Sequence, residues 1–460
     1  MQKYFTLYKP YFKQISKLSY PIIIGQIGIV LMGVADTIMI GKVDATNLAA
    51  AGLANSIYFL VTILGVGTLS AVSPLVAKAK GAGHRSETSV LFNQSINVAV
   101  VLGVIISFIL WIVTINMHWF GQDDEVEILI KPYLHILNAG NIFMLLFMGI
   151  KQFSDGLSIT KPAAIITILG LFFNVFWNWV LIYGNFGFPA LGLNGAGYAT
   201  SGTRVFMFIA LLLFVYTHKS YKHWLTVKEK SNATEFFIKI FTIGLPSGMQ
   251  YFFEVAAFSS AAIIIGWFGK DQLAAHQIAI NLASVTYMIA TGIANGGSIV
   301  VGESFGMKNK RAMILSGKAS IFMSICFMSF TALGFVFFNT YFVSLYTNDV
   351  HVASMASNLL IIAAMFQLSD GTQTVSLGIL RGILDTKVPT LITALAYWVI
   401  GIPIGWILAK YFQLNLYGIW FGLTLGLTFS AILLSWRFFR NTKRINFVLE
   451  EKLHYKTLAK

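Results

Sequence analysis

The carboxylates that could do chemistry in this chain lie inside long apolar stretches. Of the 18 Asp and Glu residues, most lie in hydrophilic segments, but Asp36, Glu254 and Asp370 do not. An ionised carboxylate in the middle of a membrane costs roughly 2.5–3.5 kcal/mol on insertion scales, so it is retained where it is paired, hydrated or protonated. A carboxylate that takes up a proton, or shares Na⁺ with neighbouring oxygens, can exchange that cation for a cationic substrate. These three residues therefore predict cation binding.

Other polar and aromatic residues could assist these acids. Asn174 and Asn178 are four residues apart, so they share one face of a predicted helix. Their carbonyl oxygens could bind an ion, and interhelical hydrogen bonding explains them equally well. Phe366 lies one turn before Asp370 and offers an aromatic face to a cation, with aromatic packing as the alternative. Arg204 is predicted to be the one buried cation, and we expect it to pair with an acid or a backbone carbonyl.

The elements that must position these residues are membrane-spanning helices. The chain has 460 residues and is 57% hydrophobic and 11% charged, whereas soluble domains carry about 25% charged residues. Segments such as 98–113 and 163–183 contain no ionised side chain and match the roughly 20 residues that cross a bilayer. A soluble fold is excluded. We predict an all-α polytopic membrane protein with twelve spans, at 15–40, 48–77, 90–115, 127–153, 162–184, 192–216, 236–268, 272–303, 313–338, 351–379, 388–411 and 415–437.

The distribution of positive charge predicts the orientation of these spans. The formal net charge is +14. If the N-terminus is placed inside, the Lys and Arg residues of the loops, the flanking helix ends and the two terminal segments fall on the inner side, except for four lysines: Lys42, Lys131, Lys270 and Lys410. Cytoplasmic loops of membrane proteins carry such an excess of Lys and Arg. Both termini are therefore predicted to be cytoplasmic, and the positive charge does not indicate a nucleic-acid partner.

The two halves of the chain resemble each other. At an offset of 225, Pro21 aligns with Pro246 and Gly67 with Gly292. Six spans in each half give repeats of parallel topology, related by a pseudo-two-fold axis along the membrane normal, as in many secondary transporters. We predict an N-lobe at 1–217, a cytoplasmic inter-lobe linker at 218–235, a C-lobe at 236–440 and a cytoplasmic tail at 441–460.

Motifs for other chemistry are missing. Gly317-Lys318 is followed by Ala319, so the chain has no Walker loop for ATP. Cys326 is the only cysteine, which excludes a disulfide framework and a thiolate metal site. We find no nucleophile or metal constellation for a membrane-embedded enzyme and no filter loop for a channel. The chain is therefore not predicted to be an enzyme, and it needs no cofactor other than a coupling ion.

Several short motifs follow one another in a characteristic order. They are Tyr20-Pro21, the stretch Val34-Ala35-Asp36-Thr37-Ile38-Met39-Ile40-Gly41, then Leu48-Ala49-Ala50, Ser73-Pro74-Leu75 and Gly244-Leu245-Pro246 with Glu254. Together they resemble the multidrug and toxic compound extrusion (MATE) family, and within it the NorM-type bacterial branch. The resemblance covers roughly residues 10–440.

The resemblance implies an outward V of two six-helix lobes in a bacterial inner membrane. It also implies secondary active efflux of cationic, lipophilic drugs in exchange for Na⁺ or H⁺. Glu254 and Asp370 would bind the coupling ion and the drug competitively in the C-lobe, and Asp36 would be the acid of the N-lobe. Residues implied as secondary contacts to ion or substrate are Asn174, Asn178, Thr200, Gln277, Ser56 and Asp349, and Phe366 joins them from its position before Asp370.

Two points of this resemblance bear on the coupling ion and the partners. Some relatives carry a second acid where this chain has Asn178, which weakens an N-lobe ion site. The presence of both Glu254 and Asp370 favours Na⁺, since a related branch assigned to protons lacks this pair. The expected partners are cationic lipophilic small molecules, the coupling cation and membrane lipids, for a protein that functions as a monomer. The alternative is a flippase for lipids or lipid-linked oligosaccharides, whose cavity should be strongly cationic to bind diphosphate.

Overall fold

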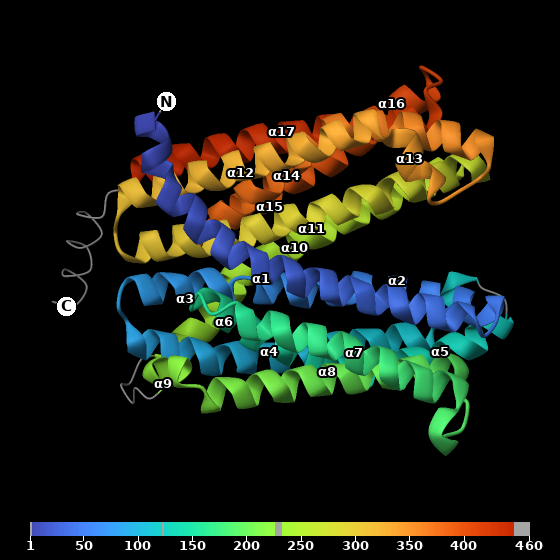
Figure 1. Ribbon diagram of the computed structural model, residues 1–460, viewed down its shortest axis with the longest axis horizontal. Helices are drawn as coiled ribbons and strands as arrows, with labels where there is room; N and C mark the ends of the chain where they lie inside the picture. Colours follow the sequence, from blue (N-terminus) through green and yellow to red (C-terminus); the bar gives the residue numbers. More distant parts are fainter. Residues whose placement is uncertain (1, 122–123, 226–231, 446–460) are drawn as a thin grey trace. The chain divides into compact units, whose positions relative to one another are not determined.

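The computed structural model describes residues 2–121, 124–225 and 232–445, and these residues form helices joined by short turns (Figure 1). Within them, twelve segments are long and apolar enough to cross a membrane. A bilayer offers the backbone no hydrogen-bond partner, so an apolar stretch satisfies its N–H and C=O groups by forming a helix. The predicted all-α fold with twelve spans is confirmed for the described part of the chain.

The described residues divide into two compact units. The N-terminal unit comprises residues 20–76 and 84–256, and the C-terminal unit comprises residues 2–19, 77–83 and 257–445. The helices α1 (Gln2–Gly41), α3 (Val72–Gly81) and α10 (Ala233–Gly266) are each shared between the units, whereas the predicted lobes keep each predicted span whole. Part of the predicted linker at 218–235 and most of the predicted tail at 441–460 lie outside the described residues.

The N-terminal unit is built from helices that lie along one another. Within it α7 packs along α8, and α4 packs along α6 (Figure 1). In chain order its elements are the second part of α1 (Gln2–Gly41), α2 (Ala45–Leu69), the first part of α3 (Val72–Gly81), α4 (Arg85–Ile115), η1 (Met117–Phe120), α5 (Asp124–Ala139), α6 (Asn141–Gly156), α7 (Lys161–Tyr183), η2 (Asn185–Gly187), α8 (Gly192–Thr217), α9 (Lys219–Leu225) and the first part of α10 (Ala233–Gly266).

The C-terminal unit has α14 at its centre, in contact with α11, α12 and α17. The π-helical turn η3 joins α15 to α16, so these three elements make one span. Besides the remainders of α1, α3 and α10, its elements are α11 (Lys270–Gly306), α12 (Lys310–Phe337), α13 (Asn339–Ser344), α14 (Val350–Gly382), α15 (Lys387–Leu395), η3 (Ala396–Gly401), α16 (Ile402–Lys410) and α17 (Asn415–Arg444).

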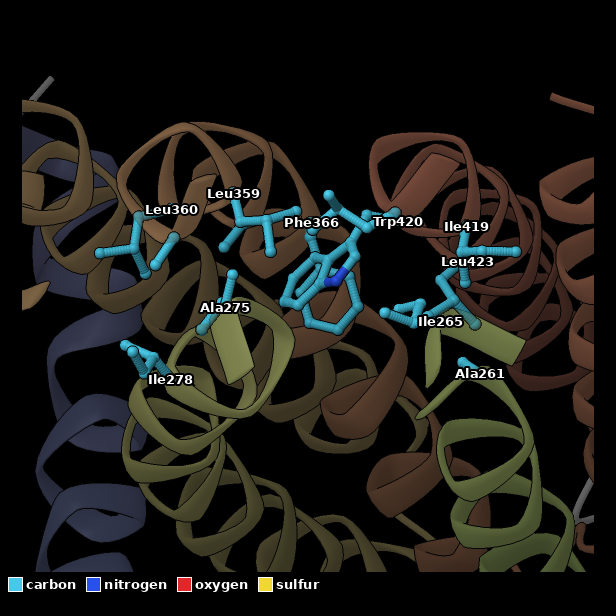
Figure 2. Close-up of a cluster of buried hydrophobic side chains, with 14 of the residues drawn as sticks. Ala261, Ile265, Ala275, Ile278, Leu359, Leu360, Phe366, Ile419, Trp420 and Leu423 are labelled. Carbon is cyan, nitrogen blue, oxygen red and sulfur yellow. The ribbon is translucent and has the colours of Figure 1, made fainter. Parts of the chain in front are cut away.

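An aromatic and aliphatic cluster forms the core of the C-terminal unit. Figure 2 shows the rings of Phe366 and Trp420 next to each other. Their centroids are 5.5 Å apart. Leu359 and Leu423 are buried beside them, and each is at most 1% exposed. Such a core is consistent with a lobe that packs by itself.

Equivalent turns and contacts recur in the two halves of the chain, 225 or 226 residues apart. A methyl group added at Gly156 would meet the Ser73 carbonyl oxygen at 2.6 Å, and one added at Gly382 would meet that of Ser298 at 2.8 Å. The left-handed turn residue Gly83, with φ 74°, likewise has its counterpart in Lys308, with φ 56°. These equivalences support the internal repeat.

One end of the N-terminal unit is closed by a buried ion pair and by α9. The Lys151 ammonium lies 2.8 Å from Asp155 Oδ2, and the two side chains are only 8% and 4% exposed. Tyr221 of α9 is fully buried, and Ser89 donates to the carbonyl of Leu225 at 3.3 Å. Burial raises the pKa of the Tyr221 phenol to about 12, and the Asp155 carboxylate acts in the same direction. The start of the predicted linker is therefore a docked helix.

A row of small residues lets α17 approach the span formed by η3 and α16. Gly418, Gly422 and Gly426 recur every fourth residue on α17, and the backbones of Gly401, Gly405 and Ala409 face them. Such small-residue patterns allow helix backbones to touch within a membrane.

Adding one methyl group to this contact should destabilise the protein. In Gly422→Ala the new Cβ would overlap the backbone of Gly405 and the carbonyl oxygen of Gly401, neither of which can rotate away. We expect a loss of about 1–3 kcal/mol of unfolding free energy, as for other overpacked sites, measured by denaturant titration in detergent. Gly334→Ala is the matched control, because nothing lies within 4 Å of its added methyl. Equal stability of the two variants would contradict this packing.

Candidate functional site

The N-terminal unit contains a cavity of about 540 Å³ beside Asp36. Ligand pockets for small molecules typically measure roughly 300–1,000 Å³ and combine an apolar lining with a few polar groups. This cavity follows that pattern. Its apolar lining comes from Ile29, Val30, Met32, Gly33, Val34, Ile38, Met144, Phe147, Met148 and Met207, and its polar lining from Asp36, Thr37, Asn55, Asn174, Thr200, Thr203 and Arg204.

Asp36 is held by polar side chains from two other helices. The side chain of Asn178 on α7 donates to Asp36 Oδ1, and the Thr200 hydroxyl on α8 donates to Oδ2 at 2.9 Å. Asn178 also donates to Asn174 Oδ1 at 3.2 Å, and Asn174 donates to the Thr200 hydroxyl at 3.4 Å. Asp36 is 7% exposed. The structure therefore brings together four residues predicted for the N-lobe site.

Asn178 has an acceptor atom that the protein leaves unused. Its Oδ1 atom is buried and accepts no hydrogen bond from any described residue. A buried polar atom without a partner costs free energy, so native structures retain it where a ligand, ion or water can satisfy it. Together with the Asp36 carboxylate, this oxygen makes the site electron-rich and suited to a cation.

Arg204 lies one helical turn after Thr200 on α8 and also lines the cavity. Its guanidinium is 4.6 Å from the centroid of the Tyr58 ring, and its Nη1 atom donates to the carbonyl oxygen of Leu137 at 3.1 Å. A backbone carbonyl was one of the two partners expected for this residue. No carboxylate of the described chain lies within ion-pair distance of Arg204.

Glu254 and Asp370 are both buried, each in its own unit. Glu254 lies on the part of α10 that belongs to the N-terminal unit and is 5% exposed. Asp370 lies on α14 in the C-terminal unit and is 4% exposed. Carboxylates buried this far within membrane spans mark functional positions by default.

The residues around Asp370 on α14 are aromatic one turn before it and polar beside it and one turn after it. Ser369 and Thr428 share a hydrogen bond of 2.7 Å, and Gln373 donates to the Tyr397 hydroxyl at 2.9 Å. Phe366 is 2% exposed and packs against Trp420 in the core of Figure 2. This placement favours the packing alternative for Phe366.

Three further predicted contacts are exposed in the structure. Gln277 is exposed on α11, and the Ser56 hydroxyl donates to the Gly52 carbonyl of its own helix at 2.8 Å. Asp349 caps the N-terminus of α14, where its Oδ1 accepts from the backbone N–H of His351 at 2.9 Å. Ser56 is not among the described residues that line the Asp36 cavity.

Sequence reasoning missed much of the cavity lining. Met32, Met144, Met148 and Met207 converge on it from three helices, and Asn55 adds a polar group from α2. Methionine is flexible and polarisable and suits binding surfaces that accept varied ligands. The spacing of Met144 and Met148 indicates one shared helix face. The sequence does not show that this face lines a cavity, because that depends on how the helices pack.

The chain is similar in sequence to bacterial multidrug resistance proteins. A family model described as MatE matches two segments, residues 21–180 and 246–407. The multidrug resistance protein NorM of Aliivibrio fischeri is 33% identical over 95% of this chain and 96% of its own length. The probable multidrug resistance protein NorM of Acinetobacter baylyi is 34% identical over 94% of this chain and 97% of its own.

Solved structures share the fold at lower identity. The eukaryotic MATE transporter AtDTX14 superimposes with a TM-score of 0.85 at 18% identity, over 93% of this chain and 95% of that one. A multidrug resistance MATE family transporter in an outward-facing conformation gives 0.86 at 21%, over 94% and 96%. At these identities the likeness shows the fold alone. The two matched segments of the family model begin 225 residues apart, as the predicted repeat does.

Proposed function

This chain belongs to the MatE family, and from that premise we propose that it is a secondary active exporter of cationic, lipophilic small molecules. The observation that carries the proposal is the cavity in which a buried carboxylate, Asp36, lies among methionine and aliphatic side chains. An apolar lining binds a lipophilic body without selecting its shape, and the single acid selects its charge. Relatives named multidrug resistance proteins agree with this reading.

Competition for the same carboxylates would couple export to an ion gradient. A cation bound at Asp36 would neutralise the charge that a drug needs, so ion and drug would exclude each other. Glu254 and Asp370, both buried in spans, would act in the same way. Ion binding would then release the drug and favour the inward-facing state. The coupling ion is Na⁺ or H⁺, and the presence of both acids favours Na⁺.

The Asp36 network suits both coupling ions. Hydrogen bonds from Asn178 and Thr200 hold the carboxylate in place, and the Asn178 and Asn174 carbonyl oxygens are hard ligands of the kind that Na⁺ and other hard cations prefer. A proton would need only one carboxylate oxygen. Each ion would enter and leave as cargo of the transport cycle.

Transport in proteoliposomes with separately imposed Na⁺ and pH gradients tests this proposal. We expect a lipophilic fluorescent cation to move against the ion that drives it, with the Na⁺ gradient the more effective. Glu254→Gln and Asp370→Asn should each slow this movement without abolishing it, because each variant keeps the other carboxylates. If neither gradient moves the dye, the proposed exchange is wrong. If both variants transport like the parent, these two residues are not the coupling site.

The proposed exporter acts in the bacterial inner membrane as a monomer, with both termini on the cytoplasmic side. Twelve candidate spans make it a multi-pass membrane protein. Accessibility of single cysteines introduced near either terminus, after replacing Cys326, would test the orientation. A lipid-diphosphate flippase is not favoured, because the described cavity lining holds one arginine beside one acid.

A further inference from the structure

Arg204 is the one cationic side chain among the described residues that line the Asp36 cavity, and ion exchange at Asp36 does not require it. A charged arginine in a membrane span is expensive and is retained for a reason. Here one backbone carbonyl and one tyrosine ring compensate it in part.

The guanidinium of Arg204 keeps most of its hydrogen-bonding capacity. An arginine has five N–H donors, and its one hydrogen bond within the described chain goes from Nη1 to the Leu137 carbonyl. No carboxylate lies within ion-pair distance. A planar guanidinium with free N–H groups matches the two oxygens of a carboxylate in a bidentate pair. The cavity therefore offers an anion site as well as a cation site.

The two charges of the cavity are separated along α8. Thr200 contacts the Asp36 carboxylate, and Arg204 lies four residues further along the same helix face. Four residues of helix rise by about 6 Å. A substrate that met both charges would carry its ammonium and its carboxylate several ångströms apart on a lipophilic body. A cavity of about 540 Å³ accommodates such a body.

We propose that Arg204 binds the carboxylate of zwitterionic amphiphiles whose cationic end lies at Asp36, so that this residue sets the preference between zwitterions and plain monocations. This inference rests on the proposed function, since it assigns a substrate class to the same cavity. Arg204 attracts the carboxylate of a zwitterion and repels a monocation that has no such group. Removing its charge should therefore change the affinities for the two classes in opposite directions.

A matched pair of xanthene dyes tests the assignment. The free-acid dye is a zwitterion at neutral pH, and its methyl ester is a monocation with nearly the same shape. Binding of each dye to the full-length protein in nanodiscs is measured by fluorescence anisotropy. In Arg204→Gln we expect the Kd of the free acid to rise about 10- to 100-fold, as for loss of hydrogen bonds between charged groups. The Kd of the ester should stay unchanged or fall.

Control variants separate recognition from a structural role. Arg440→Gln removes a similar cation over a ring, 4.7 Å from Trp436, near the C-terminal end of α17, and should leave both affinities unchanged. Arg204→Lys keeps the charge without the planar fork, so it should raise the Kd of the free acid at least about threefold and leave the Kd of the ester unchanged. If Arg204→Gln does not fold, Arg204→Lys tests the role of Arg204 by itself.

The outcomes distinguish this inference from the proposed function. If the Arg204 variants bind both dyes equally more weakly, or if the ratio of the two affinities is unchanged, the proposed role of Arg204 is wrong. If the free acid loses affinity selectively but neither dye is exported by the parent under any gradient, the carboxylate site stands and the export proposal fails. If the parent exports both dyes and Arg204→Gln exports only the ester, the result supports the role of Arg204 and the export proposal together.

Discussion

Replacing Asp36 with Asn should lower the initial rate of gradient-driven export about tenfold or more. Asp36 is the one carboxylate among the described residues that line the cavity, so its loss leaves the ion and the cationic substrate without a counter-charge there. The new amide would also bring its N–H₂ group towards the donors Asn178 and Thr200. Loss of hydrogen bonds to a charged group costs about 1.5–3 kcal/mol, and each 1.4 kcal/mol is a factor of ten. The measurement is efflux of a fluorescent cation from proteoliposomes.

The control for Asp36→Asn is the same change a few residues away. Asp44 is exposed and caps the N-terminus of α2, where its side chain accepts from the backbone N–H of Asn47 at 2.7 Å. Asparagine caps helices about as well as aspartate, so Asp44→Asn should export at the parental rate. Thermal unfolding of both variants shows whether each is folded. A folded Asp36→Asn with parental rate and parental ion dependence would place the coupling site elsewhere.

Replacing Lys151 with Met should be the most destabilising single change considered for this protein. The substitution leaves the carboxylate of Asp155 buried without its cation. Removing one partner of a buried pair costs about 3–5 kcal/mol, because the remaining charge has lost both water and its counter-ion. Unfolding in a denaturing detergent, followed by tryptophan fluorescence, measures the loss.

Two further variants test whether the buried charge is the cause. Lys151→Met combined with Asp155→Leu removes both charges and should recover most of the stability, as apolar replacements of buried pairs do. Lys131→Met breaks a pair of the same spacing with Glu127, but Lys131 is 41% exposed, so it should cost at most about 1 kcal/mol. Similar losses for Lys131→Met and Lys151→Met would show that burial of Asp155 is not the reason.

The twelve spans were predictable because length and hydropathy are local properties of the sequence. The elements that were missed depend on tertiary contacts or are too polar for hydropathy to detect. α9 lies in a stretch with three basic residues, Lys219, Lys222 and His223, and reads as a hydrophilic linker. It is nevertheless anchored by the buried side chain of Tyr221. The helix α1 starts near residue 2, ahead of the predicted start at 15, because its lysines interrupt the hydropathy without interrupting the helix.

The candidate site was predictable in part. The spacing of Asn174 and Asn178 predicted one shared face, and both residues do lie with Asp36. That Thr200 joins them across 164 residues followed from family resemblance, since no periodicity relates α1 to α8. The place of Arg204 on the cavity wall depends on how α8 is rotated against α7, which is settled by packing. Asp349 lies directly before α14, and an aspartate at that position is itself a helix-start signal, which explains the residue as a cap.

The close contact between α17 and the span of η3 and α16 has a mechanical consequence. Where backbones touch at Gly405 and Gly422, no side chains lie between the helices whose rotation could accommodate movement of one helix against the other. The pair can neither slide nor roll without steric collision, so it behaves as one stiff beam. Any change of shape within the C-terminal unit must then be taken up where helices meet through longer, rotatable side chains. Membrane thickness and lateral pressure would act on this beam as a whole.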